Sequence, residues 1–397
     1  MQRATRTITS NEMRGVNRTA VLELIRTSGP ISRTEIASTL EISLPTVMRI
    51  VDELIQSELV IPTGKKEKSG GRKRPLLSFN AGAHLVIGVD MGPEFLYGAV
   101  ADLSGRILTE HTEHHGLAGV AVYKYLVDLI EFLLKAVQPA EKQVRGICVS
   151  APGITFYDEG EVMWAPSLEW RYFPLKTKLE NHFNLPVTLE NDVNLAAQGE
   201  MWFGAGQDSR NLVLIIIGQG IGAGIIIDGA VYRGSHLTAG EIGFLLPERS
   251  ALANGWEGVG AAESAAAIPG ILARADLALE STGSGVEVED LTLEAVFAAE
   301  ASGAEWAKAV LEDTFDSLAQ ITAAVSVCYD PDVIVISGEI LPFADRIIPP
   351  ILQRLSGRIP VLPEMVPSRL GNTGAILGAV INVLHNTYDF YVVQKLT

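Results

Sequence analysis

The stretch Ile87-Gly88-Val89-Asp90-Met91-Gly92 is an apolar run that ends in an aspartate and a glycine. A short apolar run bounded by turn residues predicts a buried β-strand, here over residues 85–89. Outward from it, strand patterns recur at 95–101, 107–112 and 144–149, and a helical pattern lies around 120–137. Strands that alternate with helices predict an α/β fold.

A second set of strands and helices follows the first. The sequence predicts strands near 186–189, 212–218 and 222–227, and helices near 260–267, 304–327 and 373–385. Asp102-Leu103-Ser104-Gly105 and Asp228-Gly229 predict hairpin turns at comparable places in the two sets. We therefore expect two similar halves with a ligand-binding cleft between them.

Length and composition predict a folded protein of more than one domain. A chain of 397 residues exceeds one compact core, and 47% hydrophobic with 20% charged residues is ordinary for globular proteins. Apolar runs such as 212–217 are too short to span a bilayer, and residues 1–20 lack the pattern of a secretory signal. Cys148 and Cys328 lie in separate apolar stretches, so we expect both to be buried without a disulfide. Together these features predict a cytoplasmic protein that does not contact membranes.

Charge is divided unevenly along the chain. Residues 1–80 contain 13 Lys and Arg and 8 Asp and Glu, a net charge of +5, whereas the whole chain contains 31 and 47, a net charge of -16. The remaining residues therefore carry a net charge of -21. A basic segment before an acidic body is the asymmetry expected when the first domain approaches phosphate groups.

Two helical patterns open the chain. Residues 16–27 place apolar side chains on one face until Gly29-Pro30 ends the pattern. Ser32 and Glu35 then form the capping box of a short second helix.

A third helical pattern begins after Ser43, which can cap it, and its outward face carries Thr46 and Arg49. Three helices of these lengths are typical of a helix-turn-helix, in which the third helix enters the major groove of DNA. We therefore expect Ser43, Thr46 and Arg49 to contact bases or phosphates. A plain three-helix bundle with a solvated face is the alternative.

A basic hairpin follows the third helix. Strand patterns at 59–62 and 75–79 flank a run of Lys, Gly, Ser and Arg at 64–74. Arginines on a glycine-rich hairpin suit the narrow, negatively charged minor groove. A flexible linker is the alternative, but the run directly follows the recognition helix. We therefore predict a wing that contacts DNA through Arg72, Lys73 and Arg74.

Six short motifs occur in order along the rest of the chain. They are Ile87-Gly88-Val89-Asp90-Met91-Gly92, Ala151-Pro152-Gly153, Glu190-Asn191-Asp192-Val193-Asn194, Gly218-Gln219-Gly220-Ile221-Gly222-Ala223-Gly224, Ala239-Gly240-Glu241-Ile242-Gly243 and Gly371-Asn372-Thr373-Gly374-Ala375. Through these motifs the chain resembles the ROK family, named for repressors, open reading frames and kinases. The resemblance covers nearly the whole chain, and it is to the family's sugar-responsive xylose and N-acetylglucosamine repressors, which carry a winged helix.

The resemblance implies an α/β actin-like fold, which is the duplicated ribonuclease H-like fold of sugar kinases, behind an N-terminal all-α winged helix-turn-helix. On this basis we expect a DNA-binding domain at 1–80 and a first lobe at 81–195. The C-terminal helix, at about 380–397, would complete the first lobe, and 196–380 would form the second lobe.

The resemblance also implies a sugar site. In the family's kinases the pair that matches Asn191 and Asp192 binds sugar hydroxyls, and the aspartate is the general base; here Asp192 would be a vestigial base that only accepts a hydroxyl hydrogen. Gly153 and Glu241 match residues that line the sugar, and Glu257 matches a second sugar-binding glutamate. Without the resemblance, residues 190–192 are typical of a strand-end turn with an Asx cap.

The chain departs from the family's kinases at the phosphate turn. Kinases of this fold have Asp-x-Gly-x-Thr there, whereas this chain has Asp90-Met91-Gly92-Pro93-Glu94. Proline removes an amide donor and glutamate adds negative charge, so we expect poor phosphate binding. The glycine-rich hairpin at 218–224 survives, but such a hairpin is equally useful for packing.

The zinc ligands of the family are also missing. Phe244 stands where the family has a histidine, and no cysteine lies between Cys148 and Cys328. A tetrahedral site cannot be assembled without such ligands, so we expect no metal and no other cofactor. Phe244 also removes a polar contact to the sugar.

We therefore predict a repressor of carbohydrate genes whose effector sugar binds without catalysis. Its partners would be operator DNA, a small carbohydrate and further copies of itself, in a dimer or a tetramer, because helix-turn-helix proteins match twofold symmetry to palindromic operators. One alternative is an active ATP-dependent sugar kinase with an attached DNA-binding domain, which Asp192 favours and Pro93 and Glu94 oppose. Another is a regulator that responds to a protein partner instead of a sugar.

Overall fold

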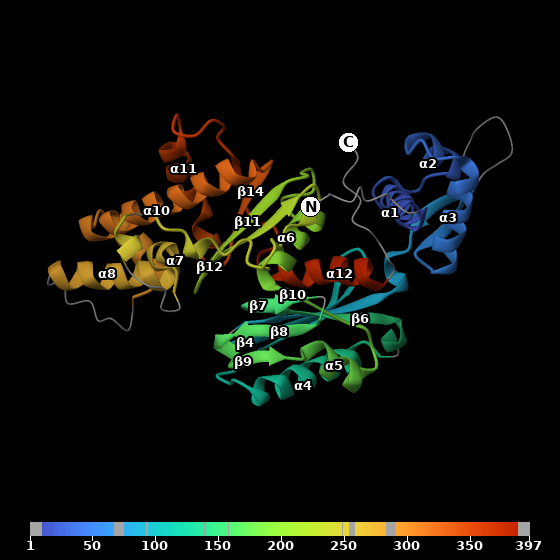
Figure 1. Ribbon diagram of the computed structural model, residues 1–397, viewed down its shortest axis with the longest axis horizontal. Coiled ribbons are helices and arrows are strands. Elements are labelled where there is room, and N and C mark those ends of the chain that lie inside the picture. Colours follow the sequence, from blue (N-terminus) through green and yellow to red (C-terminus); the bar gives the residue numbers. More distant parts are fainter. Residues whose placement is uncertain are drawn as a thin grey trace, which may run out of the picture. The chain divides into compact units, whose positions relative to one another are not determined.

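The computed structural model describes residues 10–66, 75–92, 94–138, 140–157, 159–247, 249–253, 259–282 and 291–387. The chain divides into two compact units (Figure 1). Unit 1 contains Met1–Asp192 and Ala379–Thr397, and unit 2 contains Val193–Gly378. Each unit is built on a five-stranded sheet that has both parallel and antiparallel neighbours.

Unit 1 begins with three helices and a hairpin. Helices α1 (Ser10–Ser28), α2 (Arg33–Thr39) and α3 (Leu44–Gln56) precede the antiparallel strands β1 (Val60–Lys66) and β2 (Pro75–Phe79). The capping box of α2 is present, because the Ser32 hydroxyl accepts from the Glu35 N–H and the Ser32 N–H donates to the Glu35 carboxylate. The inward stripe of α3 is fully buried; it consists of Val47, Ile50, Val51 and Leu54. The predicted winged helix-turn-helix is thereby confirmed.

The main sheet of unit 1 has the strand order β10-β6-β3-β4-β5. Strands β3 (Leu85–Met91), β4 (Phe95–Asp102) and β5 (Ile107–His114) are antiparallel neighbours, and β6 (Val144–Ala151) and β10 (Val187–Asn191) run parallel to β3. Helices α4 (Val120–Ala136) and α5 (Leu175–Phe183) lie beside this sheet (Figure 1). Their apolar side chains are buried in one core with those of the strands. Because β3, β6 and β10 are parallel, their carboxyl ends meet at one edge of the sheet.

Between β6 and β10 the structure has a small antiparallel sheet that the sequence analysis did not predict. It consists of β7 (Ile154–Phe156), β8 (Glu161–Ala165) and β9 (Trp170–Phe173). Strands this short give too few residues for a readable alternation of apolar and polar positions. The Trp170 ring stacks on Phe173 at 4.4 Å, and its indole N–H donates to the Gly119 carbonyl at 2.9 Å.

Unit 2 repeats this strand order as β13-β12-β11-β14-β15. Strands β11 (Leu212–Ile217), β12 (Ile221–Ile227) and β13 (Ala230–Val231) are antiparallel neighbours, and β14 (Val333–Ser337) and β15 (Glu364–Pro367) extend the sheet in parallel with β11. The side chains of β11 alternate between two cores, with Val213 and Ile215 in one and Leu212 and Leu214 in the other. The repeated order confirms the duplicated, actin-like architecture.

Helices cover both faces of the unit 2 sheet. They are α6 (Asp192–Phe203), α7 (Ala261–Ala266), α8 (Ile268–Thr282), α9 (Leu293–Ala301), α10 (Glu305–Tyr329), α11 (Ala344–Leu355) and α12 (Gly374–Thr387). Helix α6 begins at the last residue of the first unit 1 segment, and α12 ends within unit 1. The core shared with Leu212 and Leu214 contains α6, and the opposite core contains α7 to α11.

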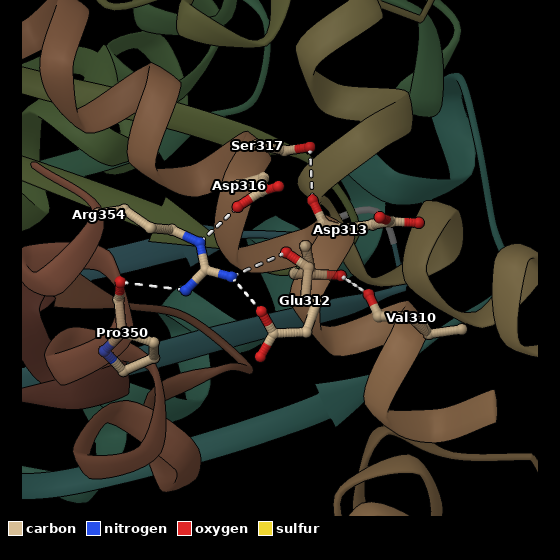
Figure 2. Close-up of polar contacts among 8 residues, drawn as sticks. Val310, Glu312, Asp313, Asp316, Ser317, Pro350 and Arg354 are labelled. Atoms are coloured by element: carbon tan, nitrogen blue, oxygen red, sulfur yellow. Dashed lines mark hydrogen bonds and ion pairs between the residues drawn. The ribbon is translucent and has the colours of Figure 1, made fainter. Parts of the chain in front are cut away.

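The guanidinium of Arg354 joins α11 to α10 (Figure 2). It donates to the Glu312 carboxylate at 2.5 Å, to the Asp316 carboxylate, and to the Pro350 carbonyl of its own helix at 3.2 Å. The guanidinium carbon also lies 5.6 Å from the centre of the Phe315 ring. These contacts hold the outer helix of this core in register with α10.

The expectation for the two cysteines is half right. Cys148 is buried on β6, and burial raises the pKa of its thiol to about 12. Cys328 is exposed, so its predicted burial is wrong. The apolar run around Cys328 is the last turn of α10, where Val325 faces the core and Val327 is 62% exposed. A helix presents successive residues to different sides, so an apolar run alone does not bury all of its members.

Candidate functional site

The outward face of α3 contains two of the predicted DNA-binding residues in exposed positions. Ser43 and Arg49 are exposed and Thr46 is half-buried. Ser43 is the N-cap residue, but its Oγ lies 2.8 Å from Thr46 Oγ1 and makes no cap hydrogen bond. Arg49 is the single cation of α3, and it has no ion pair with another described residue.

Arginines of neighbouring helices neutralise the acidic end of α3. Arg33 Nη2 lies 2.8 Å from Asp52 Oδ1, and Arg14 Nη2 lies 2.5 Å from Glu53 Oε1. Such exposed pairs add little stability, but they cancel negative charge that would repel a phosphate backbone.

Strands β1 and β2 form the stem of the predicted wing. Their register runs from Val60 opposite Phe79 to Lys66 opposite Pro75. Arg72, Lys73 and Arg74 lie outside the described residues, so their contacts with DNA stay a prediction.

The carboxyl edge of the unit 1 sheet gathers the polar groups that end β3, β6 and β10. The Ser150 hydroxyl on β6 donates to the Asp90 carboxylate on β3, and burial raises the pKa of Asp90. Asn191, the last residue of β10, donates from Nδ2 to the Gly153 carbonyl at 3.4 Å. The structure therefore brings together Asn191 and Gly153, two of the residues expected to line a sugar.

The backbone at position 153 requires a glycine. Its φ is +79°, and a Cβ there would lie 2.2 Å from the Trp164 carbonyl oxygen on β8. Only glycine accepts this conformation without strain. The small sheet that the sequence did not predict thus shapes the turn beside Asn191.

Asp192 is half-buried and opens helix α6. The N–H groups of a first helical turn favour a negative charge, which suits an ionised carboxylate at this position. The preceding Glu190 is 3% exposed, and its carboxylate accepts the Asn191 N–H at 3.0 Å. The segment is therefore a strand-to-helix junction, and it presents both Asn191 and Asp192 at the sheet edge.

In the turn after β3, where a kinase of this fold would bind phosphate, the Gly92 backbone is already in contact with Phe95. The Gly92 N–H donates to the Phe95 carbonyl at 2.9 Å, and a Cβ at Gly92 would lie 2.2 Å from the Phe95 ring. Glu94 is exposed, and Pro93 lies outside the described residues. An amide that is already bonded, next to a carboxylate, gives a phosphate little to bind.

Unit 2 holds Glu241 beside strand β12. Gly240 has a φ of +95°, and a Cβ there would lie 1.9 Å from the Ala223 carbonyl oxygen. The Ala223 N–H donates to the Gly240 carbonyl at 2.8 Å, which fixes the residue before Glu241. Desolvation by surrounding protein atoms, and then the like charge of Glu263, raise the pKa of the Glu241 carboxyl.

Glu263 is a candidate that the sequence analysis missed. Its Oε2 accepts the Ile221 N–H of the glycine-rich hairpin at 3.3 Å, and the residue lies close enough to Glu241 to affect its pKa. Glu257, which was expected to be a second sugar-binding glutamate, lies outside the described residues and stays a prediction. The available signal was a single acidic residue among small ones, in Ala261-Ala262-Glu263-Ser264-Ala265.

A second carboxylate contacts the same hairpin. Gln219 Nε2 lies 3.3 Å from both carboxylate oxygens of Glu339, which follows β14. Glu263 and Glu339 together make the Gly218–Gly224 segment acidic, which opposes a phosphate there.

Within the described ranges no group of three or more His, Cys, Asp or Glu side chains could hold a metal ion. Phe244, at the position of the family's histidine, is 39% exposed. No helix of the described segments is long and apolar enough to cross a bilayer.

A sequence model of the ROK family matches residues 86–386, which is more than half of the chain. The chain belongs to the ROK family. A model of the MarR family matches residues 16–63, the region of α1 to α3 and the start of the wing.

Relatives of this ROK protein include repressors. It is 35% identical over 232 residues to a putative xylose repressor of Caldicellulosiruptor sp. (strain Rt8B.4), a match that spans only 58% of either chain. It is 29% identical over 346 residues to the DNA-binding transcriptional dual regulator NagC of Escherichia coli K12, which covers 85% of this chain and 84% of NagC.

Solved structures include regulators and kinases. A ROK family transcriptional regulator, described as a homologue of the E. coli MLC protein, matches with a TM-score of 0.83 and 27% identity over 95% of this chain and 97% of that one. A ROK family glucokinase from Streptomyces griseus, solved with glucose and AMPPNP, matches with a TM-score of 0.64 and 25% identity over 75% of this chain and 98% of that one. The fold therefore does not by itself separate a regulator from an enzyme.

Proposed function

We propose that this ROK protein is a transcription regulator that binds operator DNA through α3 and the wing, and whose DNA affinity is set by a small sugar. The observation that carries the proposal is a winged helix-turn-helix attached to a sugar-kinase fold whose phosphate turn is closed by its own chain. The regulated genes, on this proposal, serve carbohydrate use. The protein acts as a homodimer, since two winged helices match the two halves of a palindromic operator.

Replacing Arg49 with alanine is expected to weaken specific DNA binding about tenfold, since one arginine contact to a base contributes about 1–3 kcal/mol. The change removes the cation of α3 and leaves the buried stripe of the helix intact. Fluorescence anisotropy measures it, on a duplex that the full chain has selected from random DNA.

A matched control for Arg49→Ala is Arg106→Ala, because Arg106 is 71% exposed on a hairpin of the unit 1 sheet. If Arg49→Ala and the unchanged protein bound the duplex with equal affinity, the proposal that α3 is the recognition helix would be wrong. Failure to select any duplex would remove the whole proposal.

We further propose that Asn191, Asp192 and the Gly153 backbone of unit 1 accept hydroxyl hydrogens of a sugar. For unit 2 we propose Glu241 and Glu263 as acceptors of sugar hydroxyls. A carboxylate or amide oxygen that accepts a hydroxyl hydrogen holds a sugar without any chemical step. The sugar then shifts the population between two states of the protein, by as much as its affinity for them differs. Calorimetry over a panel of sugars and sugar phosphates identifies the effector, and binding that left DNA affinity unchanged would refute this control.

Affinity for that sugar is expected to fall as the pH is lowered, and to do so at a higher pH than an ordinary glutamate would cause. The ionised Glu241 carboxylate is the better acceptor, and its raised pKa means that it takes up a proton earlier as the pH falls. Glu241→Gln should flatten this pH dependence. Glu263→Gln removes a like charge, so it should move the change to lower pH; calorimetric titrations at several pH values would show an unchanged profile if the assignment were wrong.

The competing function is sugar phosphorylation, which the similarity to ROK kinases favours. We expect no ADP release when the protein is given ATP, magnesium and the sugar that binds to it. The closed turn at Gly92 and the carboxylates of Glu94, Glu263 and Glu339 oppose the nucleotide phosphates. Turnover that Asp192→Asn abolished would overturn the proposal in favour of an active kinase with Asp192 as base.

A further inference from the structure

Two apolar side chains share the outward face of α3 with Arg49. Positions that differ by four along a helix lie on the same side, so Leu44 and Met48 form one row and Pro45 and Arg49 form the next. Leu44 is 38% exposed and Met48 is 48% exposed, and Pro45 and Arg49 are also exposed. The side of α3 that would face DNA is therefore largely apolar.

The polar residues near the start of α3 are less available than their sequence suggests. The hydroxyls of Ser43 and Thr46 bond each other at 2.8 Å, and Thr46 is half-buried. Beyond Arg49 the next outward residue is Asp52, which Arg33 neutralises at 2.8 Å. Leu44 and Met48 are thus the side chains left to meet base edges beside Arg49.

In the major groove the apolar group on a base edge is the C5-methyl of thymine. A leucine and a methionine gain from burying such a methyl, and the unbranched methionine side chain can adjust to its position. Neither side chain has a hydrogen-bond donor to satisfy a purine N7 or a guanine O6.

We propose that Leu44 and Met48 read thymine methyl groups in each operator half-site, next to the base that Arg49 contacts. This inference rests on the proposed DNA-binding function and adds to it a base preference. The occupant of the apolar face is the major groove, because the basic charge of residues 1–80 and the exposed Arg49 are complementary to DNA.

The test replaces thymines one at a time with deoxyuridine in the duplex selected from random DNA. Deoxyuridine keeps the base pair and removes only the methyl group. The unchanged full-length protein should lose about fourfold in affinity at one or two thymines of each half-site, the value expected for one buried carbon group. Elsewhere in the duplex the substitution should have no effect.

Two variants then assign the methyl contacts to side chains. In Leu44→Ala and in Met48→Ala, deoxyuridine at one thymine position should no longer lower the affinity. The protein change and the DNA change form a double-mutant cycle, and their effects are non-additive only when the two groups are in contact. Both side chains are exposed, so the fold of α3 should be kept, and circular dichroism checks this. Leu277→Ala is the matched control, because Leu277 is 66% exposed on α8 of unit 2; it should keep the full deoxyuridine effect.

Three outcomes would overturn the inference. One is an affinity that no deoxyuridine changes, and another is a loss that persists in both variants. The third is a change of oligomeric state in Leu44→Ala or Met48→Ala by analytical ultracentrifugation, which would make the apolar face a contact between copies of the chain. A failure of the DNA-binding proposal is distinct from these, because no duplex would then be selected at all.

Discussion

Replacing Glu200 with alanine is expected to lower the free energy of unfolding of unit 2 by about 3–5 kcal/mol, one of the larger effects of a single change. The Glu200 side chain is 1% exposed, and its carboxylate accepts the Ala205 N–H at 2.7 Å and the Leu370 N–H at 3.1 Å. It also accepts the Ser368 hydroxyl. Alanine would leave the Ala205 N–H and the Ser368 hydroxyl without this buried acceptor, and the Leu370 N–H with only the Ser368 Oγ at 3.2 Å. Denaturation in urea, followed by tryptophan fluorescence, measures the loss.

The Glu200 network also affects the proposed sugar site. Glu200 lies at the end of α6, the helix that Asp192 opens, and it fixes the segment that precedes α12. Glu200→Ala should therefore weaken sugar binding as well as stability. Glu200→Gln keeps one acceptor oxygen and should cost about half as much, and Glu280→Ala, an exposed glutamate on α8, serves as the control. A stability equal to that of the control would show that the buried network contributes nothing.

The helix-turn-helix could be predicted from the sequence in most of its parts because its signals are local. A capping box and an apolar stripe each depend on residues three or four positions apart, so the capping box of Ser32 and Glu35 and the helix over residues 16–27 could be predicted. The hydrogen bond between the Ser43 and Thr46 hydroxyls could not be predicted, because it depends on rotamers that a pattern of residue types does not specify. Contacts of these two residues with DNA stay a prediction.

The proposed sugar site is less accessible to prediction. Motifs that match the family name Gly153, Asn191, Asp192 and Glu241, whereas the contact of Glu263 with the glycine-rich hairpin has no such motif. Glu257 lies outside the described residues and stays a prediction. Glu263 is 42 residues from Ile221, the hairpin residue whose N–H it accepts. Such a contact is created by the packing of α7 on the sheet, and spacing along the chain does not reveal it. The small sheet at β7 to β9, which makes Gly153 obligatory, was missed for a different reason, because its strands are too short for a readable alternation of apolar and polar residues.

A buried histidine connects α3, the proposed recognition helix, to the strand that ends at the proposed sugar site. His84 is 1% exposed, and its Nε2 lies 3.1 Å from the carbonyl of Ser57, the C-cap residue of α3. Its Nδ1 accepts from Arg145 Nε at 3.0 Å. Arg145 lies at the start of β6, and Ser150 and Gly153 lie at and just beyond its other end.

The two contacts of His84 require one protonation state. Nδ1 can accept from Arg145 only without a proton, and Nε2 donates to the Ser57 carbonyl with one, so the imidazole is neutral. Desolvation lowers the pKa of His84, which agrees with this state. The neutral ring therefore holds β6 and the end of α3 together by two hydrogen bonds of opposite direction.

Replacing His84 with alanine is expected to uncouple sugar from DNA binding. Couplings of this kind commonly amount to about 1–3 kcal/mol, a 5- to 150-fold change in DNA affinity, and His84→Ala should reduce the response to less than about twofold. DNA affinity is measured with and without the sugar found by calorimetry, and sugar affinity itself should change little. His84→Gln keeps a donor and an acceptor and should retain part of the response, whereas His111→Ala, at an exposed position on β5, should retain all of it.

The pattern across these variants separates a positioning role from a merely structural one. If His84 only stabilised unit 1, the alanine and glutamine variants would lower the unfolding free energy yet leave the ratio of DNA affinities with and without sugar unchanged. A full response in His84→Ala would therefore mean that the signal bypasses this contact. Loss of the response with sugar binding intact is the result expected if a shift at the carboxyl end of β6 reaches α3 through Arg145 and His84.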